Sequence, residues 1–374
     1  MKAKATILTI LLAVFYPFTF LVPFHRNRIT FISLEHANLS KDFKVLYDRL
    51  CKSGQYDLKL VLFKFEPTIW GNFRYGLACV RQLFAVASSR LVLLDYNNFV
   101  IAKFPHRQRT KVMQVWHATG ALKKFGNAVR RDYAIQHYDY AIVNSDFYQP
   151  IFAEAFNVPE AQVLVTGIPN NDKLFSTDFV STTRARLLAE YPQLQGKKVV
   201  TYAPTFRGRI TTAIHEVEAD LAKVKAALGD DYVVVYKAHP LVEHSKYNHV
   251  PGVYELGDEL ISSTFCVTDV LVTDYSAIAI DWMVFDKPVI SFAPDYKGYH
   301  RRPGFFIDYR HEFPGPITRN EAQLVAEIQS VDTPKAQAAA KRRRERFSHK
   351  VYRYMDGQST GRVVAAIETI MQQV

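Results

Sequence analysis

The chain has 374 residues, of which 48% are hydrophobic and 22% are charged, and its formal net charge is +11. This length exceeds what one hydrophobic core comfortably supports, so two domains are expected, and the composition excludes a disordered protein. Three scattered cysteines, Cys51, Cys79 and Cys266, exclude a disulfide framework and a paired-cysteine zinc site, and they indicate a reducing compartment.

The chain begins with an apolar segment, residues 5–24, that has basic residues on both sides. About 20 apolar residues suffice to cross a bilayer as a helix, and the small residues of a signal-peptide cleavage site are missing. Pro17 and Pro23 fit a segment that enters one leaflet as well as one that spans the membrane. We therefore predict a membrane anchor in residues 1–28, with the rest of the protein at the cytoplasmic face of the membrane.

Short apolar runs alternate with helical patterns along the rest of the chain. The first half predicts a helix near 75–88 and strands at 29–34, 58–63, 91–94, 140–143 and 162–165, with another strand that begins at 111 and ends at His117. The second half predicts strands at 198–202, 232–236, 270–273 and 288–292, and helices near 183–190, 213–228, 259–265, 276–285 and 360–371.

Alternation of this kind predicts parallel βαβ units. The predicted fold class is α/β, with two doubly wound Rossmann-like domains after the membrane segment. A polar stretch near residue 176 sets the expected domains at 29–175 and 176–374, with the last helix able to pack back on the first domain.

Two histidines occupy equivalent places in the two halves. His117 follows a strand that begins at Lys111, and His239 follows the run Tyr232–Tyr236. Ligands of open α/β sheets bind at the carboxyl ends of the strands. An imidazole is the usual group for removing a hydroxyl proton, which makes His117 a candidate base, while His239 could donate to a diphosphate. Each histidine also has a structural interpretation, as a satisfied residue at a strand end or a domain interface.

An anion site is predicted where the strand ending at Thr273 meets the helix that follows Ser276. Free backbone N–H groups and both hydroxyls could hold a phosphate there, although Ser276 could also be a plain helix cap. Arg207 follows another strand and could pair with phosphate or lie at the surface. Lys123 and Lys124 lie where an anionic acceptor could pass. The glycine motifs of ATP and dinucleotide sites are missing from the sequence.

The positive charge favours an anionic partner. Lys341–Arg346 is the densest basic run, and it could also be the solvated face of a helix. The sequence has no aromatic-basic RNA motif and no helix-turn-helix pattern, so an anionic membrane surface is expected rather than nucleic acid. Acidic residues do not cluster as metal ligands, so no metal and no cofactor are predicted.

Eight segments between about residues 110 and 365 occur in an order typical of one family: Trp116–Gly126, Gly167–Asp172, Tyr202–Arg207, His239–Leu241, Thr273–Ser276, Gly304–Tyr309, Phe313–Pro316 and Asp356–Gly357. Together they resemble the CDP-glycerol glycerophosphotransferase family that builds teichoic acids, and most closely its glycerol-phosphate primases. The resemblance implies a glycosyltransferase-B type fold with the nucleotide in the C-terminal half. His117 matches the family's proposed base. His239, Thr273 and Ser276 match residues that hold the CDP-glycerol diphosphate, with Arg207 an additional candidate.

The resemblance implies an enzyme that transfers glycerol phosphate from CDP-glycerol and releases CMP. The implied acceptor is undecaprenyl-diphosphate-linked ManNAc-GlcNAc, in the priming step of wall teichoic acid synthesis. One alternative is a poly(glycerol-phosphate) or ribitol-phosphate transferase or polymerase of teichoic acid or capsule synthesis. An alternative of another class is a non-catalytic, membrane-bound scaffold of a cell-wall assembly complex. The sequence leaves the acceptor sugar and the oligomeric state open.

Overall fold

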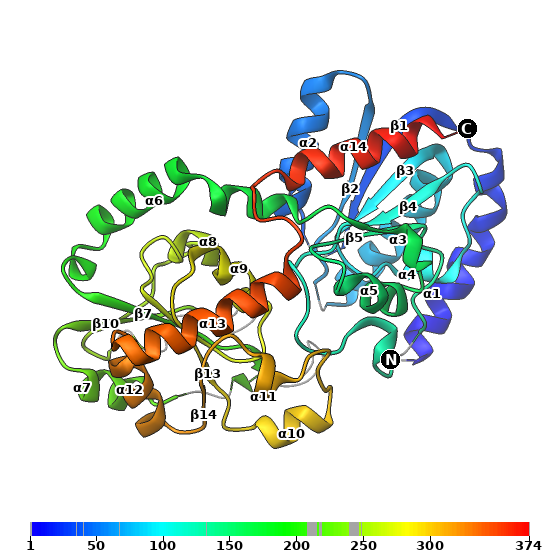
Figure 1. Cartoon of the computed structure of the whole chain (residues 1–374). Helices are drawn as coiled ribbons and strands as arrows, with labels where there is room; N and C mark the ends of the chain where they lie inside the picture. The colour runs from blue at the N-terminus through cyan, green and yellow to red at the C-terminus, as the bar shows by residue number, and fades with distance from the viewer. Residues whose placement is uncertain are drawn as a thin grey trace. The chain divides into compact units, whose positions relative to one another are not determined.

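The computed structural model describes residues 2–34, 36–39, 41–66, 68–131, 133–207, 215–216, 219–238, 247 and 249–373 (Figure 1). The chain forms two compact units. The first contains Met1–Thr119, Phe125–Asp172 and Tyr352–Val374, and the second contains Gly120–Lys124 and Lys173–Val351. A single split at residue 175 therefore does not describe these units, because the chain passes between them more than once.

The first unit is built on a six-stranded parallel sheet in the order β2-β1-β3-β4-β5-β6. Its strands are β1 (His25–Ser33), β2 (Asp57–Leu62), β3 (Ser89–Leu94), β4 (Lys111–Gln114), β5 (Tyr140–Val143) and β6 (Val163–Val165). Every residue of β3 is buried, as expected for a central parallel strand that is covered on both faces.

Helices cover both faces of this sheet. They are α1 (Lys2–Phe15), η1 (Tyr16–Leu21), α2 (Lys41–Ser53), α3 (Ile69–Ser88), α4 (Phe99–Lys103), η2 (Gly126–Ala128), α5 (Tyr148–Phe156), η3 (Glu160–Gln162), η4 (Pro169–Phe175, which continues into the second unit) and α14 (Ser359–Gln372). Apolar side chains of α2 and α14 share one core with β1, β3, β4 and β5. Figure 1 shows α2 and α14 together on one face of the sheet. Distant parts of the sequence therefore build the first unit.

The predicted anchor does not form one long helix. α1 ends at Phe15, and the 3₁₀ helix η1 follows with Pro17 in its first turn. Proline lacks an N–H group and its ring clashes with the preceding helical turn, so the α-helix stops there. Within the described part of the chain, the structure contains no helix that is both long enough and apolar enough to span a bilayer.

The second unit has its own six-stranded parallel sheet, in the order β11-β10-β7-β12-β13-β14. Its strands are β7 (Lys198–Ala203), β10 (Tyr232–Tyr236), β11 (Val253–Tyr254), β12 (Val270–Thr273), β13 (Val289–Phe292) and β14 (Ile317–Thr318). A short antiparallel ribbon joins β8 (Phe206–Arg207) to β9 (His215–Glu216).

The helices of the second unit are α6 (Thr177–Glu190), η5 (Pro192–Leu194), α7 (Leu221–Leu228), α8 (Ile261–Thr264), α9 (Ile278–Trp282), η6 (Met283–Phe285), α10 (Tyr296–Arg301), α11 (Tyr309–Glu312), α12 (Glu321–Ser330) and α13 (Pro334–Val351). α7 and α12 pack on one face of the sheet, and α6 packs on the other. Two parallel sheets flanked by helices confirm the predicted α/β class.

Each sheet has a point where the strand order reverses, between β1 and β3 in the first unit and between β7 and β12 in the second. Ligands of open α/β sheets bind beyond the carboxyl ends of the strands at such a point. His117 follows β4 of the first sheet, and Thr273 is the last residue of β12, at the reversal point of the second sheet.

Candidate active site

His117 lies in a turn beyond β4 rather than at the end of the strand. β4 ends at Gln114, three residues earlier than predicted, because Trp116 takes a left-handed backbone conformation with φ of 64°. The fully buried Gln114 stabilises this turn. Its Oε1 accepts a hydrogen bond from the Trp116 backbone N–H at 2.9 Å, and its Nε2 donates to the Tyr96 carbonyl at 3.1 Å. A non-glycine residue keeps such a conformation only when its surroundings enforce it.

The orientation of the His117 ring is fixed by its neighbours. Nδ1 lies 3.1 Å from the backbone carbonyl oxygen of Asp95, and the ring stacks on Tyr96 with centroids 4.1 Å apart and planes 14° apart. A carbonyl oxygen can only accept, so Nδ1 carries the proton and Nε2 of the neutral ring keeps its lone pair. In this tautomer Nε2 can accept a proton.

The segment Gly167–Asp172 stabilises the start of α14. The Asp172 carboxylate accepts hydrogen bonds from the backbone N–H groups of Ser359 and Thr360, at 2.8 and 2.7 Å, and from the Thr360 hydroxyl at 2.6 Å. A Cβ on Gly167 would lie 2.3 Å from the Ser359 hydroxyl oxygen, and φ at Gly167 is 80°. A side chain at position 167 would therefore collide with the start of α14. The Gly167–Asp172 motif therefore packs against the start of α14, just after the Asp356–Gly357 motif.

The same segment also contacts the chain just after His117. Asn171 donates from Nδ2 to the Thr119 hydroxyl at 2.6 Å, and the Asn170 backbone N–H donates to the Asp42 carboxylate at 2.7 Å. Both Thr119 and Asp42 are buried. Buried polar groups of this kind are costly to leave unpaired, so these bonds stabilise the loop that follows the candidate base.

In the second unit, Thr273 is the last residue of β12, beside the end of β7, and Ser276 lies in the loop that follows. Thr273 is opposite Ala203 in the register, is fully buried, and donates its hydroxyl proton to the Ala203 carbonyl at 2.7 Å. A threonine has one hydroxyl proton, so donation to a phosphate would require this bond to break. Ser276 is half-buried, and its Oγ accepts from the Ile278 N–H at 3.3 Å, near the start of the five-residue helix α9.

The two residues between Thr273 and Ser276 connect the motif to its surroundings. The buried Asp274 accepts hydrogen bonds from the Thr205 backbone N–H at 3.0 Å and from the Thr205 hydroxyl, which joins the loops after β7 and β12. Tyr275 donates from its hydroxyl to Asp295 at 2.9 Å, and Tyr309 donates to the Asp274 carbonyl at 2.8 Å. These bonds fix the loop at the point where the strand order reverses.

Lys123 and Lys124 belong to the second unit, although the sequence predicted them in the N-terminal domain. Their segment pairs with residues 304–306: the Lys124 N–H donates to the Gly304 carbonyl, and the Phe306 N–H donates to the Leu122 carbonyl, both at 2.9 Å. This antiparallel pairing assigns the segment to the second unit. The Lys124 side chain is exposed and that of Lys123 is half-buried.

Arg207 and His239 lie near the limits of what the structure describes. Arg207 is in β8, whose backbone pairs with β9. His239 falls outside the described residues, which end at Ala238 on this side of the loop. Just before it, the Lys237 N–H donates to the Tyr202 carbonyl at 2.9 Å. Burial lowers the pKa of Lys237, despite the opposing effect of nearby carboxylates, chiefly that of Asp258.

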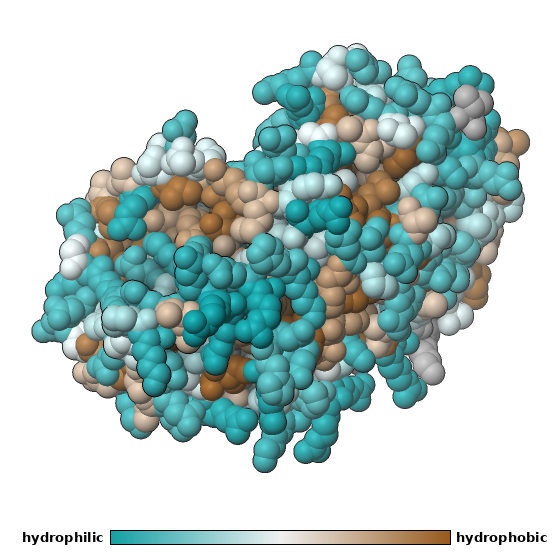
Figure 2. Space-filling view, in the orientation of Figure 1, coloured by the Kyte–Doolittle hydropathy of each residue, from teal (hydrophilic) through white to brown (hydrophobic). Residues whose placement is uncertain are grey.

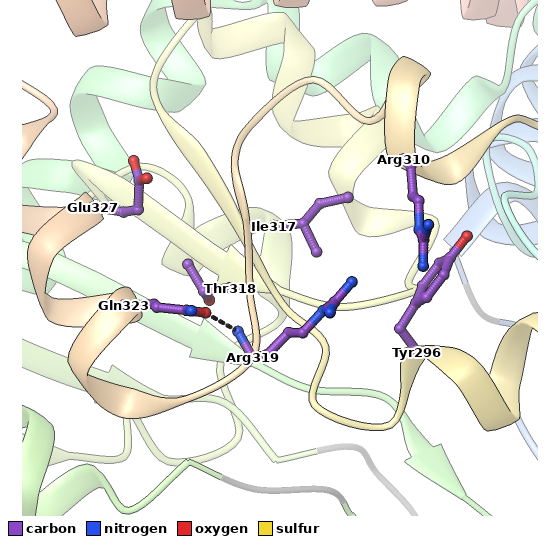
Figure 3. Close-up of a pocket in the computed structure, with 7 residues that line it drawn as sticks. All are labelled: Tyr296, Arg310, Ile317, Thr318, Arg319, Gln323 and Glu327. Carbon is purple, nitrogen blue, oxygen red and sulfur yellow. Dashed lines mark hydrogen bonds between the residues drawn. The ribbon is translucent and has the colours of Figure 1, made fainter.

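A polar pocket of about 520 Å³ lies beside β14 (Figure 3). It is lined by Tyr296, Arg310, Ile317, Thr318, Arg319, Gln323 and Glu327. Figure 3 shows the Arg310 and Arg319 side chains extending toward the same space. The Arg310 guanidinium lies 4.7 Å from the centre of the Tyr296 ring. The sequence did not single out these residues, because they come from α10, α11, β14, the residue after β14, and α12, without a common pattern.

The residues that the structure describes include no group of three or more potential metal ligands.

Comparison with known proteins gives the chain its family. Residues 14–369 match the family described as CDP-glycerol:poly(glycerophosphate) glycerophosphotransferase. The chain belongs to this family. It is therefore an enzyme, a phosphotransferase of the family that uses CDP-glycerol, as the motifs predicted.

Two relatives and one solved structure show how far the likeness extends. A teichoic acid ribitol-phosphate primase of Bacillus spizizenii is 31% identical over 371 residues, which cover 94% of this chain and 93% of the relative. A teichoic acid glycerol-phosphate primase of Bacillus subtilis is 26% identical over 307 residues, which cover 78% of this chain and 77% of the relative. A structure of the wall teichoic acid polymerase TagF is similar with a TM-score of 0.75 at 21% identity, and covers 99% of this chain and 98% of that one. The last comparison supports the fold.

Proposed function

We propose that the enzyme transfers one glycerol phosphate unit from CDP-glycerol to undecaprenyl-diphosphate-linked ManNAc-GlcNAc and releases CMP, as the priming step of wall teichoic acid synthesis. The family match over residues 14–369 and the likeness to a glycerol-phosphate primase support this choice. The observation that carries it is the geometry of His117, whose Nδ1 faces the Asp95 carbonyl so that Nε2 can accept a proton. The glycosyltransferase-B type fold implied by the motifs is part of the same proposal.

In the proposed mechanism, Nε2 of His117 removes the proton from a sugar hydroxyl of the acceptor. The hydroxyl oxygen then attacks the β-phosphorus of CDP-glycerol in line. A new bond forms between this oxygen and the β-phosphorus, and the bond from the β-phosphorus to the bridging oxygen breaks. CMP leaves with the electron pair, and the proton passes from His117 to solvent. Catalysis of this kind depends on orientation and electrostatic stabilisation.

The second unit is proposed to hold the donor. His239, Ser276 and Arg207 would contact the diphosphate, and Thr273 would stabilise the loop through its bond to Ala203. Lys123 and Lys124 would attract an anionic acceptor. Because the proposed acceptor is a lipid, the enzyme would work at the cytoplasmic face of the membrane, attached to an anionic surface through residues 5–24.

A second candidate donor is CDP-ribitol. The observation that favours it is the 31% identity to a ribitol-phosphate primase over nearly the full length of both chains. Competition decides between the two: with CDP-glycerol and CDP-ribitol present at equal concentration, the mass of the added unit identifies the preferred donor. A product that carries only ribitol phosphate would replace the glycerol assignment and leave the mechanism unchanged.

The decisive experiment incubates the full chain with CDP-glycerol and a synthetic lipid-linked disaccharide and measures product mass and CMP. One added unit supports a primase, whereas a ladder of products identifies a polymerase. The absence of CMP release with either donor would contradict an enzymatic role and favour the scaffold alternative. His117→Ala is the matched inactive control.

A further inference from the structure

The first unit exposes an apolar surface, here called the α1/α3 face. On α1 it contains Ile7, Ile10, Leu11 and Val14; on η1 it contains Phe18, Phe20 and Leu21; and on α3 it contains Ile69, Trp70, Phe73 and Leu77. These side chains are between 40% and 93% exposed. Figure 2 shows hydrophobic residues at the surface along the edge where α1 runs. Soluble monomers rarely expose a contiguous apolar surface of this kind unless it is a binding site.

The face is continuous because α1 and α3 pack against each other. On α1 the exposed residues recur every three or four positions, while Leu8, Leu12 and Phe15 on the opposite side pack into a core with Cys79 and Leu83 of α3. A Cβ on Gly76 would lie 3.6 Å from a Leu11 methyl group, which shows how closely the helices approach. Both helices therefore turn one apolar side to a shared core and another to the outside.

The α3 part of the face contains stacked aromatic rings. Trp70 and Phe73 are exposed, and their ring centroids lie 5.3 Å apart. Thr68 caps the helix just before them by accepting a hydrogen bond from the Gly71 N–H at 2.9 Å. Tryptophan is enriched at membrane–water interfaces, where its ring lies at the level of the lipid headgroups.

Basic residues border the face. Arg74 and Arg81 are exposed one and three turns after Trp70 on the same side of α3. Lys59 lies near both Arg28 and Arg81. Its pKa is lowered chiefly by burial, and further by the positive charges of these two arginines. Residues 2–28 contain no acidic residue, and residues 57–88 contain only Asp57 and Glu66. Asp57 is paired with Arg28 at 2.7 Å. The resulting positive potential is complementary to anionic lipid headgroups.

Residues 5–24 are attached to the body of the first unit. The Arg107 guanidinium donates to the Thr19 and Val22 carbonyls at 2.5 and 3.2 Å, and the Tyr16 hydroxyl donates to the Pro105 carbonyl at 2.6 Å. Leu12 is fully buried against α3. A segment held in this way presents only its outer side to a membrane, as an interfacial helix does.

We infer that the α1/α3 face inserts into one leaflet of an anionic membrane, with α1 and α3 lying along the surface and Trp70 and Phe73 forming part of the contact. This deepens the proposed membrane attachment, which named residues 5–24 alone, and it rests on that proposal only for the choice of a lipid partner. Vesicle binding is measured without substrates, so its failure is distinguishable from a failure of the proposed transfer reaction.

The first test measures cosedimentation of the full chain with phosphatidylcholine vesicles that contain phosphatidylglycerol. The double variant Trp70→Glu/Phe73→Glu changes exposed side chains only, so the chain is expected to fold, and binding is expected to fall about a hundredfold because two buried side chains are lost from the contact. Leu260→Glu, an equally apolar and exposed position in the second unit, is the matched control and should bind normally. Unchanged binding of the Trp70→Glu/Phe73→Glu variant, with loss of binding in Phe18→Glu/Leu21→Glu, would overturn the contribution of α3.

The second test examines charge. Arg74→Gln/Arg81→Gln should weaken binding to anionic vesicles by about fivefold per residue, with no such loss on pure phosphatidylcholine. Arg342→Gln/Arg343→Gln removes the same charge from exposed positions of α13 in the second unit and should change binding less. A larger loss in the α13 variant would assign the membrane contact to that helix instead.

The third test measures depth and excludes a second copy of the chain as the occupant. Vesicles should shift Trp70 emission to the blue, and lipids brominated near the headgroup should quench it more than lipids brominated at the chain ends. Trp70→Phe should remove both effects, because Trp282 is fully buried and the Trp116 ring packs against Phe125 and Phe156 inside the protein. A dimer in solution that dissociates in Trp70→Glu, with no vesicle binding by the parent chain, would overturn the membrane assignment.

Discussion

The carboxyl edges of the two sheets hold their candidate site residues in different ways. In the first unit, the Asp95 carbonyl, the Tyr96 ring and the Gln114-stabilised turn determine the position of His117. In the second unit, the Thr273 hydroxyl donates to the backbone, and the Ser276 oxygen accepts from it.

This difference follows from what each edge is proposed to do. A group that moves a proton needs one tautomer and one orientation, so its environment is specified on several sides. An anion can be held by several donors at once, including backbone N–H groups, so no single side chain is indispensable. We therefore expect mutations at the first edge to have large effects on turnover, and mutations at the second to have graded effects on donor binding.

The largest effect is expected at His117. His117→Ala should lower kcat by about 10³-fold, because no other described side chain is proposed as a base, while the affinity for CDP-glycerol changes less than about twofold. CMP release and equilibrium binding of CDP-glycerol measure the two quantities. His349→Ala, an exposed histidine on α13, is the control. Turnover that survives in His117→Ala would place the base elsewhere and remove the contrast between the two edges.

The next effect concerns Gln114 as a positioning residue. Gln114→Leu leaves the Trp116 N–H and the Tyr96 carbonyl without their partner, so the His117 turn should relax. We expect kcat to fall about thirtyfold with an unchanged KM for CDP-glycerol, and the free energy of unfolding to fall by about 2 kcal/mol. A loss of activity that only tracks the fraction of unfolded protein would assign Gln114 a purely structural role.

Asp172 tests whether the first edge depends on its structural hydrogen bonds. Asp172→Ala removes three hydrogen bonds at the start of α14 and should lower the free energy of unfolding by about 2 kcal/mol in urea titrations. Asp178→Ala, in the first turn of α6, is the matched acidic control. Equal stability of the two variants would show that the Asp172 bonds contribute little.

Variants of Thr273 and Ser276 test the second edge, which is proposed to bind the donor. Ser276→Ala should raise the KM for CDP-glycerol about fivefold and leave kcat nearly constant. Thr273→Val loses its bond to Ala203 and should cost about 1 kcal/mol of stability. A larger increase in KM for Thr273→Val than for Ser276→Ala would show that the Thr273 hydroxyl reorients toward the donor.

The smallest effect is a pH dependence of stability in the first unit. Burial opposes the charged form of His106, but its hydrogen bond and ion pair with Asp139 outweigh this and raise its pKa. A raised folded-state pKa stabilises the protein fully below about 6.5 and loses that contribution as pH rises through the folded value. Stability should therefore decline by at most about 1 kcal/mol as the pH rises from about 6 to about 8. His106→Gln should reduce this slope, and a slope unchanged from the parent would exclude His106. Burial also lowers the pKa of the neighbouring His137. The slope measured for His106→Gln is therefore compared with that of the parent chain, in which His137 is also present.

The strands were predictable because parallel strands covered on both faces are continuous apolar runs. β5, β10 and β12 have the predicted bounds, and β3 differs by two residues. The end of β4 was not predictable, because the turn at Trp116 depends on Gln114 bonding to the Tyr96 loop, which is distant in sequence. The predicted apolar segment 5–24 is divided at Phe15 into α1 and η1, because Pro17 stops the α-helix.

The site was predictable only in part. The sequence predicted His117 and Ser276 from their places after strands, and both stay predictions, whereas Gln114 and Asp172 act through contacts between distant segments and carry no local signal. A glutamine beside a strand end and an aspartate in an asparagine-rich turn are also common in ordinary loops, so neither residue type indicates its role. The hydrogen bond of Thr273 could not be predicted for the same reason, because only the register of β7 and β12 reveals its partner at Ala203.

The insertion of the second unit within the first affects how the protein is made. Val363, Ile367 and Ile370 of α14 complete the core between α2 and the sheet, so a nascent chain cannot finish the first unit until they leave the ribosome. Roughly 180 residues of the second unit are synthesised in between. At about 5–20 residues per second this takes on the order of 10–40 s, during which one face of the first sheet stays uncovered. Translation speed across the second unit therefore sets how long the apolar side chains on that face remain exposed in the nascent enzyme.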